Sequence, residues 1–100
     1  MVNRNGSTRT TIPESARHVV QDALAELSAY PLEVAIRGRY CYVSHAGDPL
    51  CRLGWRSQDD VWDFAIWRYS RANYAPFELA SATGTPRDCI RTALRAYDLW

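Results

Sequence analysis

Residues 53–70, LGWRSQDDVWDFAIWRYS, bring together aromatic and cationic side chains that could bind a partner. Three of the four tryptophans of the chain lie in this stretch, together with two arginines. Guanidinium groups hydrogen-bond phosphates and carboxylates and stack on rings, and aromatic side chains offer flat apolar surfaces. This composition is typical of surfaces that bind nucleic acid or another protein. The residues concerned are Trp55, Trp62, Trp67, Arg56 and Arg68.

Cysteine and histidine suggest a metal site, but their spacing does not support one. A strand rises about 3.3 Å per residue, which places Cys41 and His45 about 13 Å apart, too far to share an ion. Strand alternation places Cys41 and Cys51 on opposite faces of the predicted sheet. Cys89 stands at a helix start, where it is expected to fill space. We therefore expect neither a metal nor any other cofactor.

No residues suggest catalysis, because a nucleophile needs a base within reach. His18 falls on the polar side of a helix and His45 near a turn, and neither has a suggestive neighbour. Asp59 and Asp60 occupy a turn, where aspartate is favoured for backbone reasons. There is no glycine-rich phosphate loop either. The sequence predicts a protein without enzymatic activity.

A second group of cations, Arg87, Arg91 and Arg95, recurs at four-residue spacing and forms a ridge on the last predicted helix. Asp88 can pair with Arg91 and Asp98 with Arg95, which would make an ordinary solvated face. The alternative is a ridge that follows phosphates, and it is our second choice for a basic binding surface.

Two helices enclose the predicted strands. Thr11 and Glu14 have the spacing of a capping box, and apolar residues then recur at three- and four-residue spacing, so a helix is predicted over 12–29. The pair Thr85–Pro86, with Asp88, starts the second helix, which is predicted to run to the end of the chain.

Between the helices the apolar period falls to two, which indicates strands. One strand is predicted over 32–42, a second after a turn near Gly47, a third over 61–69 and a short fourth over 73–79. Pro76 places the fourth strand at an edge, and 80–84 reads as a loop. The fold class is therefore α+β: a two-layer α-β-β-β-β-α order, with both helices on one face of a four-stranded antiparallel meander. Residues 1–10 are predicted to form a flexible polar arm, and 11–100 a single domain.

The predicted register assigns side chains to the two faces. A second hairpin centred on Gln58–Asp59 places three apolar pairs on the face that the helices cover. A first turn at Ala46–Gly47 or Gly47–Asp48 keeps Tyr40 and Tyr42 on that same face. Arg68 also has core parity, so it must lie at the rim or beyond a bulge. The three pairs are Trp55 with Trp62, Leu53 with Phe64, and Cys51 with Ile66.

The opposite face gathers arginines on two strands and aromatic rings on the next two. We predict a binding face made of Arg37, Arg39, Arg52, Arg56, Trp67 and Tyr69. Its other members are Cys41, Val43, Val61, Asp63, Ala65, Tyr74, Pro76 and Glu78.

The overall composition limits the partners. The net charge is +1, so any attraction for nucleic acid must come from charge segregation. All 12 basic residues are arginine, which is typical of a GC-rich bacterial genome. The three cysteines lack the spacing of a disulfide framework, and no stretch resembles a signal peptide or a membrane span. We expect a cytoplasmic protein that does not bind membranes.

The helix–strands–helix order, with a basic final helix, resembles the double-stranded-RNA-binding domain. The lysine-rich start of that family's last helix is missing, since 85–91 reads TPRDCIR. The segment WDFAIWRYSRANYAPFEL, followed by a loop and TPRDCIRTAL, is more similar to a family of small uncharacterised bacterial domains. Those domains have a tryptophan-rich final hairpin and a closing helix. That resemblance implies the fold and no mechanism.

Two functions fit the predicted face. One is a non-catalytic interaction module that binds a protein partner or a second copy of itself, since arginine, tryptophan and tyrosine are enriched at interface hot spots. The alternative is a nucleic-acid-binding module in which the arginines contact phosphates and the rings stack on bases. The near-neutral charge favours the first, and the clustering of four arginines favours the second.

Overall fold

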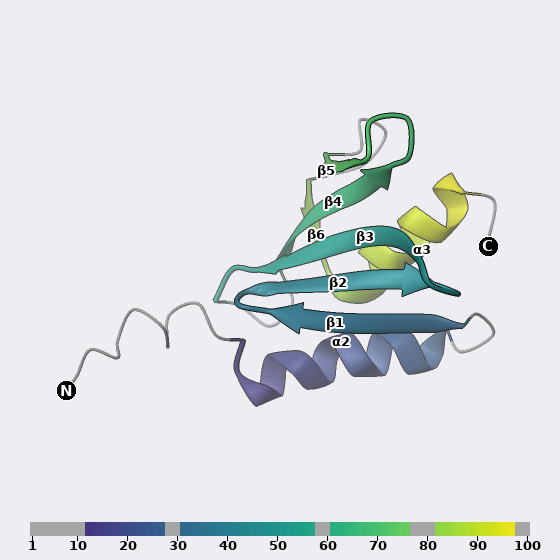
Figure 1. Cartoon of the computed structure of the whole chain (residues 1–100). Helices are drawn as coiled ribbons and strands as arrows, with labels where there is room; N and C mark the ends of the chain where they lie inside the picture. Colours follow the sequence, from purple (N-terminus) through teal and green to yellow (C-terminus); the bar gives the residue numbers. More distant parts are fainter. Residues whose placement is uncertain (1–11, 28–30, 58–60, 77–81, 98–100) are drawn as a thin grey trace.

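A computed structural model describes residues 12–27, 31–57, 61–76 and 82–97 of the 100-residue chain (Figure 1). Two helices enclose six strands along the sequence. They are α2 (Glu14–Glu26), β1 (Leu32–Arg37), β2 (Tyr40–His45), β3 (Asp48–Trp55), β4 (Trp62–Arg68), β5 (Asn73–Ala75), β6 (Thr83–Gly84) and α3 (Pro86–Ala96).

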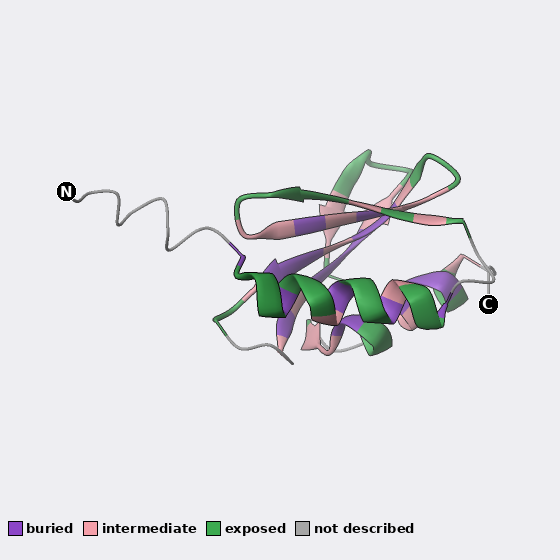
Figure 2. Ribbon diagram, turned by 90° about the horizontal axis from the view of Figure 1, so that it is seen from below, coloured by how far each residue is buried: buried purple, intermediate pink, exposed green. Residues whose placement is uncertain are grey.

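The strands form one antiparallel sheet in the order β1-β2-β3-β4-β5, and β6 pairs with β4 alongside β5. The apolar sides of both helices contribute to one core under this sheet, and α2 turns its exposed residues outward (Figure 2). The α+β class is confirmed, with six strands instead of four. The short strand β5 lies at an edge, as Pro76 indicates, while β6 occupies part of the predicted loop 80–84. Within the described residues, no helix is long and apolar enough to span a bilayer.

The start of α3 follows the predicted chemistry. Thr85 is the N-cap, and its Oγ1 accepts a hydrogen bond of 3.2 Å from the backbone N–H of Asp88. Pro86 fills the first turn, where its missing N–H costs nothing. The helix α2 is shorter than the predicted 12–29, because its N-cap is Pro13, which provides no side-chain bond. The predicted cap residue Thr11 lies outside the described residues.

The single strand predicted over 32–42 is wrong, because the chain reverses at Gly38–Arg39. Gly38 takes a φ of +58°, a conformation that glycine adopts without steric cost, and Arg37 pairs with Tyr40 across the two-residue turn. Paired residues share a face, so Tyr40 and its neighbour Tyr42 lie on the side of Arg37. The intervening positions Cys41 and Val43 point into the core, the reverse of the predicted assignment. Both are buried.

An irregularity between β2 and β3 brings β3 into phase with β2, so that the buried residues of both strands share one face of the sheet. The hairpin turns at Ala46–Gly47, one of the two predicted centres, and both residues have the positive φ of a type I′ turn. Ser44 pairs with Pro49, but Val43 pairs with Cys51, so Leu50 is an extra residue in the manner of a β-bulge. Pro49 has no N–H to give to a regular ladder.

The hairpin of β3 and β4 has the predicted register, and all three predicted apolar pairs are confirmed. Its turn residues 58–60 lie outside the described residues. Trp62 is fully buried, whereas Trp55 is partly exposed and packs against the core. Arg68 lies at the end of β4, where its Nε donates to Asn73 Oδ1 over 3.3 Å, and so takes the predicted position at the rim.

The core depends on Trp62 more than on any other aromatic side chain of the described residues. We expect Trp62→Ala to lower the free energy of unfolding by about 3–5 kcal/mol, since it removes a fully buried ring. Trp67→Ala, which truncates a half-buried ring on the other face, should cost much less. Urea denaturation of both variants measures the difference, and equal losses would contradict the assignment of the faces.

Candidate functional site

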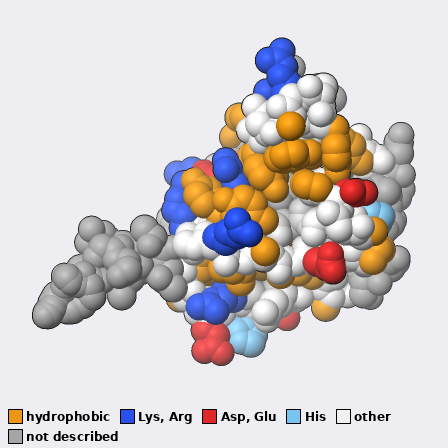
Figure 3. Space-filling view, in the orientation of Figure 1, with side chains coloured by type: hydrophobic (Ala, Val, Ile, Leu, Met, Phe, Trp, Pro, Cys, Tyr) orange, Lys and Arg blue, Asp and Glu red, His pale blue; other side chains and the backbone are white. Residues whose placement is uncertain are grey.

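The surface of the sheet that neither helix covers is called here the outer face. Arginine, tyrosine and tryptophan side chains gather on it over β2 to β5, and Figure 3 shows hydrophobic side chains with arginines beside them. Besides Glu33, Ser44 and Pro49 at one end and Thr83 of β6, the strand register places ten residues on this face. They are Ala35, Arg37, Tyr40, Tyr42, Arg52, Gly54, Asp63, Ala65, Trp67 and Tyr74.

Guanidinium groups stack on the tyrosine rings of the outer face. The Cζ atom of Arg52 lies 4.6 Å from the ring centroid of Tyr40 and 5.2 Å from that of Tyr74. Arg39 Cζ lies 4.5 Å from the Tyr40 centroid, and Arg37 Cζ lies 5.9 Å from that of Tyr42. Each contact is within the range of a cation–π interaction, worth about 0.5–1 kcal/mol at exposed sites. The rings therefore hold the arginines in fixed orientations.

Asp63 binds two of the four predicted arginines. Its Oδ1 lies 3.0 Å from Arg56 Nη1, and its Oδ2 lies 3.4 Å from Arg39 Nη1. Arg39 also donates from Nη1 to the carbonyl oxygen of Trp55 over 3.0 Å and from Nη2 to the hydroxyl of Tyr40 over 2.9 Å. Three partners thus fix Arg39, and the carboxylate of Asp63 neutralises part of the combined charge of Arg39 and Arg56.

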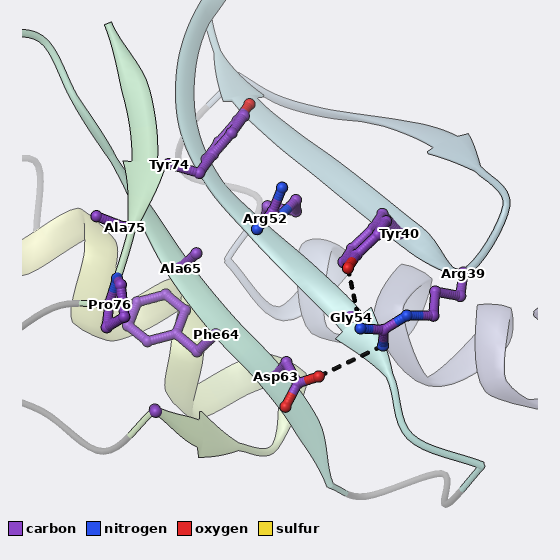
Figure 4. A pocket seen from close by; sticks show the side chains of 11 residues that line it. Arg39, Tyr40, Arg52, Gly54, Asp63, Phe64, Ala65, Tyr74, Ala75 and Pro76 are labelled. Atoms are coloured by element: carbon purple, nitrogen blue, oxygen red, sulfur yellow. Dashed lines mark hydrogen bonds and ion pairs between the residues drawn. The ribbon is translucent and has the colours of Figure 1, made fainter. Parts of the chain in front are cut away.

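Gly54 makes the close approach of these side chains possible. A Cβ atom at this position would stand 3.0 Å from Arg39 Nη1, 3.0 Å from Tyr40 Cε1 and 3.2 Å from Asp63 Cβ. Real Cβ contacts are almost never shorter than this. The backbone of β3 at Gly54 therefore forms the floor on which Arg39 and Tyr40 lie (Figure 4).

The aromatic rings continue across β4 and β5. Tyr74 lies 5.6 Å from Tyr42 and 4.9 Å from Trp67 between ring centroids, both tilted or edge-on contacts. Trp67 contacts Tyr69 at 6.2 Å, and Tyr69 contacts Tyr97 of the segment after α3 at 5.7 Å. The aromatic contacts therefore run from the middle of the outer face to the end of the sheet.

Tyr69 lies at this end of the sheet and not over its middle. The Tyr69 hydroxyl donates to the carbonyl oxygen of Pro49 over 2.6 Å. The residue is 53% exposed. The hydroxyl of Tyr97 donates to the carbonyl oxygen of Trp67. These bonds join the end of β4 to β3 and to the segment after α3, so they give Tyr69 a structural role.

A hollow of about 310 Å³ opens on the outer face between β2 and the β4–β5 hairpin (Figure 4). Arg52 and the rings of Tyr40 and Tyr74 line it, with Gly54 and Asp63 at one end. Arg39 also lines it, and the rest of the lining is small or apolar. The hollow is at the lower limit of small-molecule sites, which span roughly 300–1,000 Å³, so its size suits one side chain better than a cofactor.

The structure brings together five of the six predicted residues of the binding face, and Tyr69 lies apart from them at the sheet end. The sequence pattern wrongly assigns Tyr40 and Tyr42 to the core, and it wrongly assigns Cys41 and Val43, which are buried, to this face. The signal that could have separated them is Gly38, a turn residue between two runs of alternating residues.

The basic ridge on α3 is partly used within the fold. Arg87 Nη1 lies 2.9 Å from Glu26 Oε2, an ion pair that joins α3 to the end of α2. Arg91 is half-buried, whereas Arg87 and Arg95 are exposed, so the ridge is not equally accessible along its length. Asp98, the predicted partner of Arg95, lies outside the described residues.

The three cysteines point into the core, so the prediction that Cys41 and Cys51 lie on opposite faces is wrong. All three are free and buried. Burial raises the pKa of Cys41 from 9.0 to about 11 and that of Cys89 to about 12. It also raises the pKa of Cys51, with further increases from Cys89 and Cys41. Among the described residues, no group of three or more histidine, cysteine or acidic side chains could hold a metal ion.

No protein-family model, curated protein or solved structure shows significant similarity to the chain. The resemblance to small bacterial domains therefore stays a prediction.

The ion pairs at Asp63 should contribute little to stability, because their side chains are 36–49% exposed. We expect Asp63→Asn to lower the free energy of unfolding by about 1 kcal/mol or less. High salt should reduce this difference, since it screens exposed charges. Glu26→Gln, which removes the Arg87 pair and changes the net charge equally, is the control for urea denaturation. A large loss that persists in salt would contradict a surface role for Asp63.

The buried thiols predict a loss of stability in alkali. The folded state binds the thiol proton of Cys41 more tightly than the unfolded state, since its pKa is raised from 9.0 to about 11. This contribution is fully present below pH 9 and is lost as the pH rises through about 11. Urea denaturation should show a smaller alkaline decline for Cys41→Ala than for the natural chain. Burial also raises the pKa values of Tyr69, Tyr74 and Tyr97, so part of the decline should remain.

Proposed function

We propose that the chain is a non-catalytic interaction module that binds a partner protein through its outer face. The observation that carries this proposal is the pre-ordered layer of stacked arginine and tyrosine side chains on a sheet surface that no helix covers. Arginine, tyrosine and tryptophan are enriched among the few residues that dominate the binding energy at protein interfaces. Side chains that are already ordered lose less entropy when a partner binds.

The charge of the face supports a protein partner over nucleic acid. Arg39 and Arg56 already share Asp63, so two of the four predicted phosphate contacts are engaged inside the protein. Arg37 and Arg52 contact rings instead of carboxylates. The net charge of the whole chain is only +1, which gives little long-range attraction for a polyanion.

A nucleic-acid-binding module is the second candidate, and the same two arginines favour it. Their guanidinium groups contact tyrosine rings on an open sheet, an arrangement that could place phosphates beside stacked bases. The outer face is not basic enough to bind a continuous row of phosphates, since only Arg37 and Arg52 would contribute.

Titration of a single-stranded oligonucleotide against salt separates the two candidates. If Arg37 and Arg52 contact phosphates, log affinity against log salt should have a slope of about −1.4, against about −2.8 for all four predicted arginines. The interaction module instead predicts poor oligonucleotide binding even at low salt. Tight binding with the steeper slope would contradict the proposed function.

Variants of the outer face test whether it binds a protein partner. We expect Tyr42→Ala and Trp67→Ala to remove a protein that co-purifies with the natural chain from its producing cells, because both rings belong to the outer face. Arg71→Gln, in the exposed turn between β4 and β5, should retain it. Sedimentation of the pure chain at micromolar concentration shows whether that partner is a second copy. Equal retention by all variants would place the interface elsewhere.

A further inference from the structure

Among the described residues, no carboxylate pairs with one cation of the hollow on the outer face. Arg52 is half-buried between the rings of Tyr40 and Tyr74. Among the residues that the structure describes, its guanidinium has these ring contacts and neither a hydrogen bond nor an ion pair. The nearby carboxylate of Asp63 is engaged by Arg39 and Arg56. Arg52 therefore keeps its hydrogen-bonding capacity for a ligand.

The two rings fix the direction in which Arg52 can donate. A guanidinium presents its N–H groups in one plane, and rings at 4.6 and 5.2 Å restrict the movement of that plane. A planar guanidinium with free N–H groups forms paired hydrogen bonds to a carboxylate, which is also planar. Much of the rotamer entropy of Arg52 is already lost before a ligand arrives.

Neighbouring hydroxyl groups add to this preference for an acceptor. The Tyr40 oxygen accepts from Arg39, so its own proton is free to point toward the hollow. The Tyr74 hydroxyl is protonated at neutral pH, and burial raises its pKa further above its ordinary value. A ligand that enters the hollow thus meets the donors of Arg52, with the rings of Tyr40 and Tyr74 beside it.

We propose that this hollow binds one side-chain carboxylate, from a glutamate or aspartate in an acidic segment of a partner protein, with Arg52 as the anion-binding residue. The inference rests on the proposed function, because it names the partner chemistry of the same face. The hollow of about 310 Å³ has room for a single side chain, and its apolar lining would contact the methylene groups beside the carboxylate.

The charges of the hollow favour a carboxylate over a phosphate. One uncommitted guanidinium matches one negative charge, whereas a phosphate monoester carries about −1.5 to −2 at neutral pH. Asp63 at the end of the hollow would repel the additional charge. A second copy of the chain is also disfavoured, since its outer face would carry the same excess of arginine and not the acidic side chains that Arg52 favours.

The test uses a short peptide of alternating glutamate and alanine, acetylated and amidated so that its ends are uncharged. The matched peptide has glutamine in place of glutamate. Nitrogen-edited NMR of the arginine Nε–H and tryptophan indole signals follows the titration. We expect the glutamate peptide to shift the Arg52 signal in a saturable way, and the glutamine peptide to leave it unchanged.

Variants assign the binding to Arg52. Arg52→Gln should weaken the glutamate peptide about tenfold or more, since a charge-assisted hydrogen bond is lost. Arg52→Lys keeps the charge without the paired donors, so it should give an intermediate affinity. Tyr74→Leu should also weaken binding because it removes one of the two rings that restrict the Arg52 guanidinium. Arg71→Gln changes the net charge equally outside the hollow and should bind as the natural chain does. Thermal melts of each variant confirm that it is folded.

Three results would overturn the inference. The first is that folded Arg52→Gln binds the glutamate peptide as tightly as the natural chain does. The second is that inorganic phosphate or an oligonucleotide binds at the Arg52 signal more tightly than the glutamate peptide. The third is that the chain self-associates and Arg52→Gln abolishes this self-association. The proposed function fails separately, if Tyr42→Ala and Trp67→Ala retain the co-purifying partner. If those two variants lose the partner while Arg52→Gln retains it, the interaction module stands and the carboxylate site is rejected.

Discussion

Antiparallel pairing obliges directly opposed residues to share a face of the sheet, and in this protein that constraint acts through two irregular points. The turn at Gly38–Arg39 moves Tyr40 and Tyr42 outward beside Arg37. The extra residue Leu50 then brings β3 into phase, so that Arg52 reaches the same face as both tyrosines. Without the bulge, the continuous ladder from the Ala46–Gly47 turn would set Arg52 opposite Cys41 and direct it toward the core.

The two faces of the sheet are stabilised by different interactions. Trp62, Phe64 and the aliphatic side chains of both helices fill the covered face, where the loss of apolar surface from water provides the main stabilisation. On the outer face, which neither α2 nor α3 covers, the rings are packed by edge contacts and by guanidinium groups. Gly54 is important to this second layer, because a side chain at that position would displace Arg39 and Tyr40.

Internal pairing changes what an arginine-rich sequence can bind. Four arginines on neighbouring strands suggest a basic groove, yet Asp63 engages two of them and tyrosine rings hold the others. The outcome is an aromatic surface with a few directed donors instead of a broad positive field. Such a surface selects a partner by shape and by individual acceptors, which is the usual basis of specificity at protein interfaces.

Strong local patterns were sufficient for much of the fold. Hydrophobic periodicity predicted both helices, Thr85–Pro86 predicted the start of α3, and the alternation around Gln58–Asp59 predicted the register of β3 and β4. These features depend on neighbours in sequence, so the sequence by itself determined them. The faces of Tyr40, Tyr42, Cys41 and Val43 could not be predicted in the same way, because the missed turn reverses the parity of the residues that follow it until the bulge at Leu50 restores it.

The binding chemistry of the face was likewise decided by tertiary structure. The sequence showed that Arg39, Arg56 and Asp63 share a surface, but not that one carboxylate would bind both arginines. It also placed Arg52 on this face without its two ring contacts, which come from strands β2 and β5 on either side. Contacts of this kind depend on distances between strands, and residue types and spacing along one strand do not contain them.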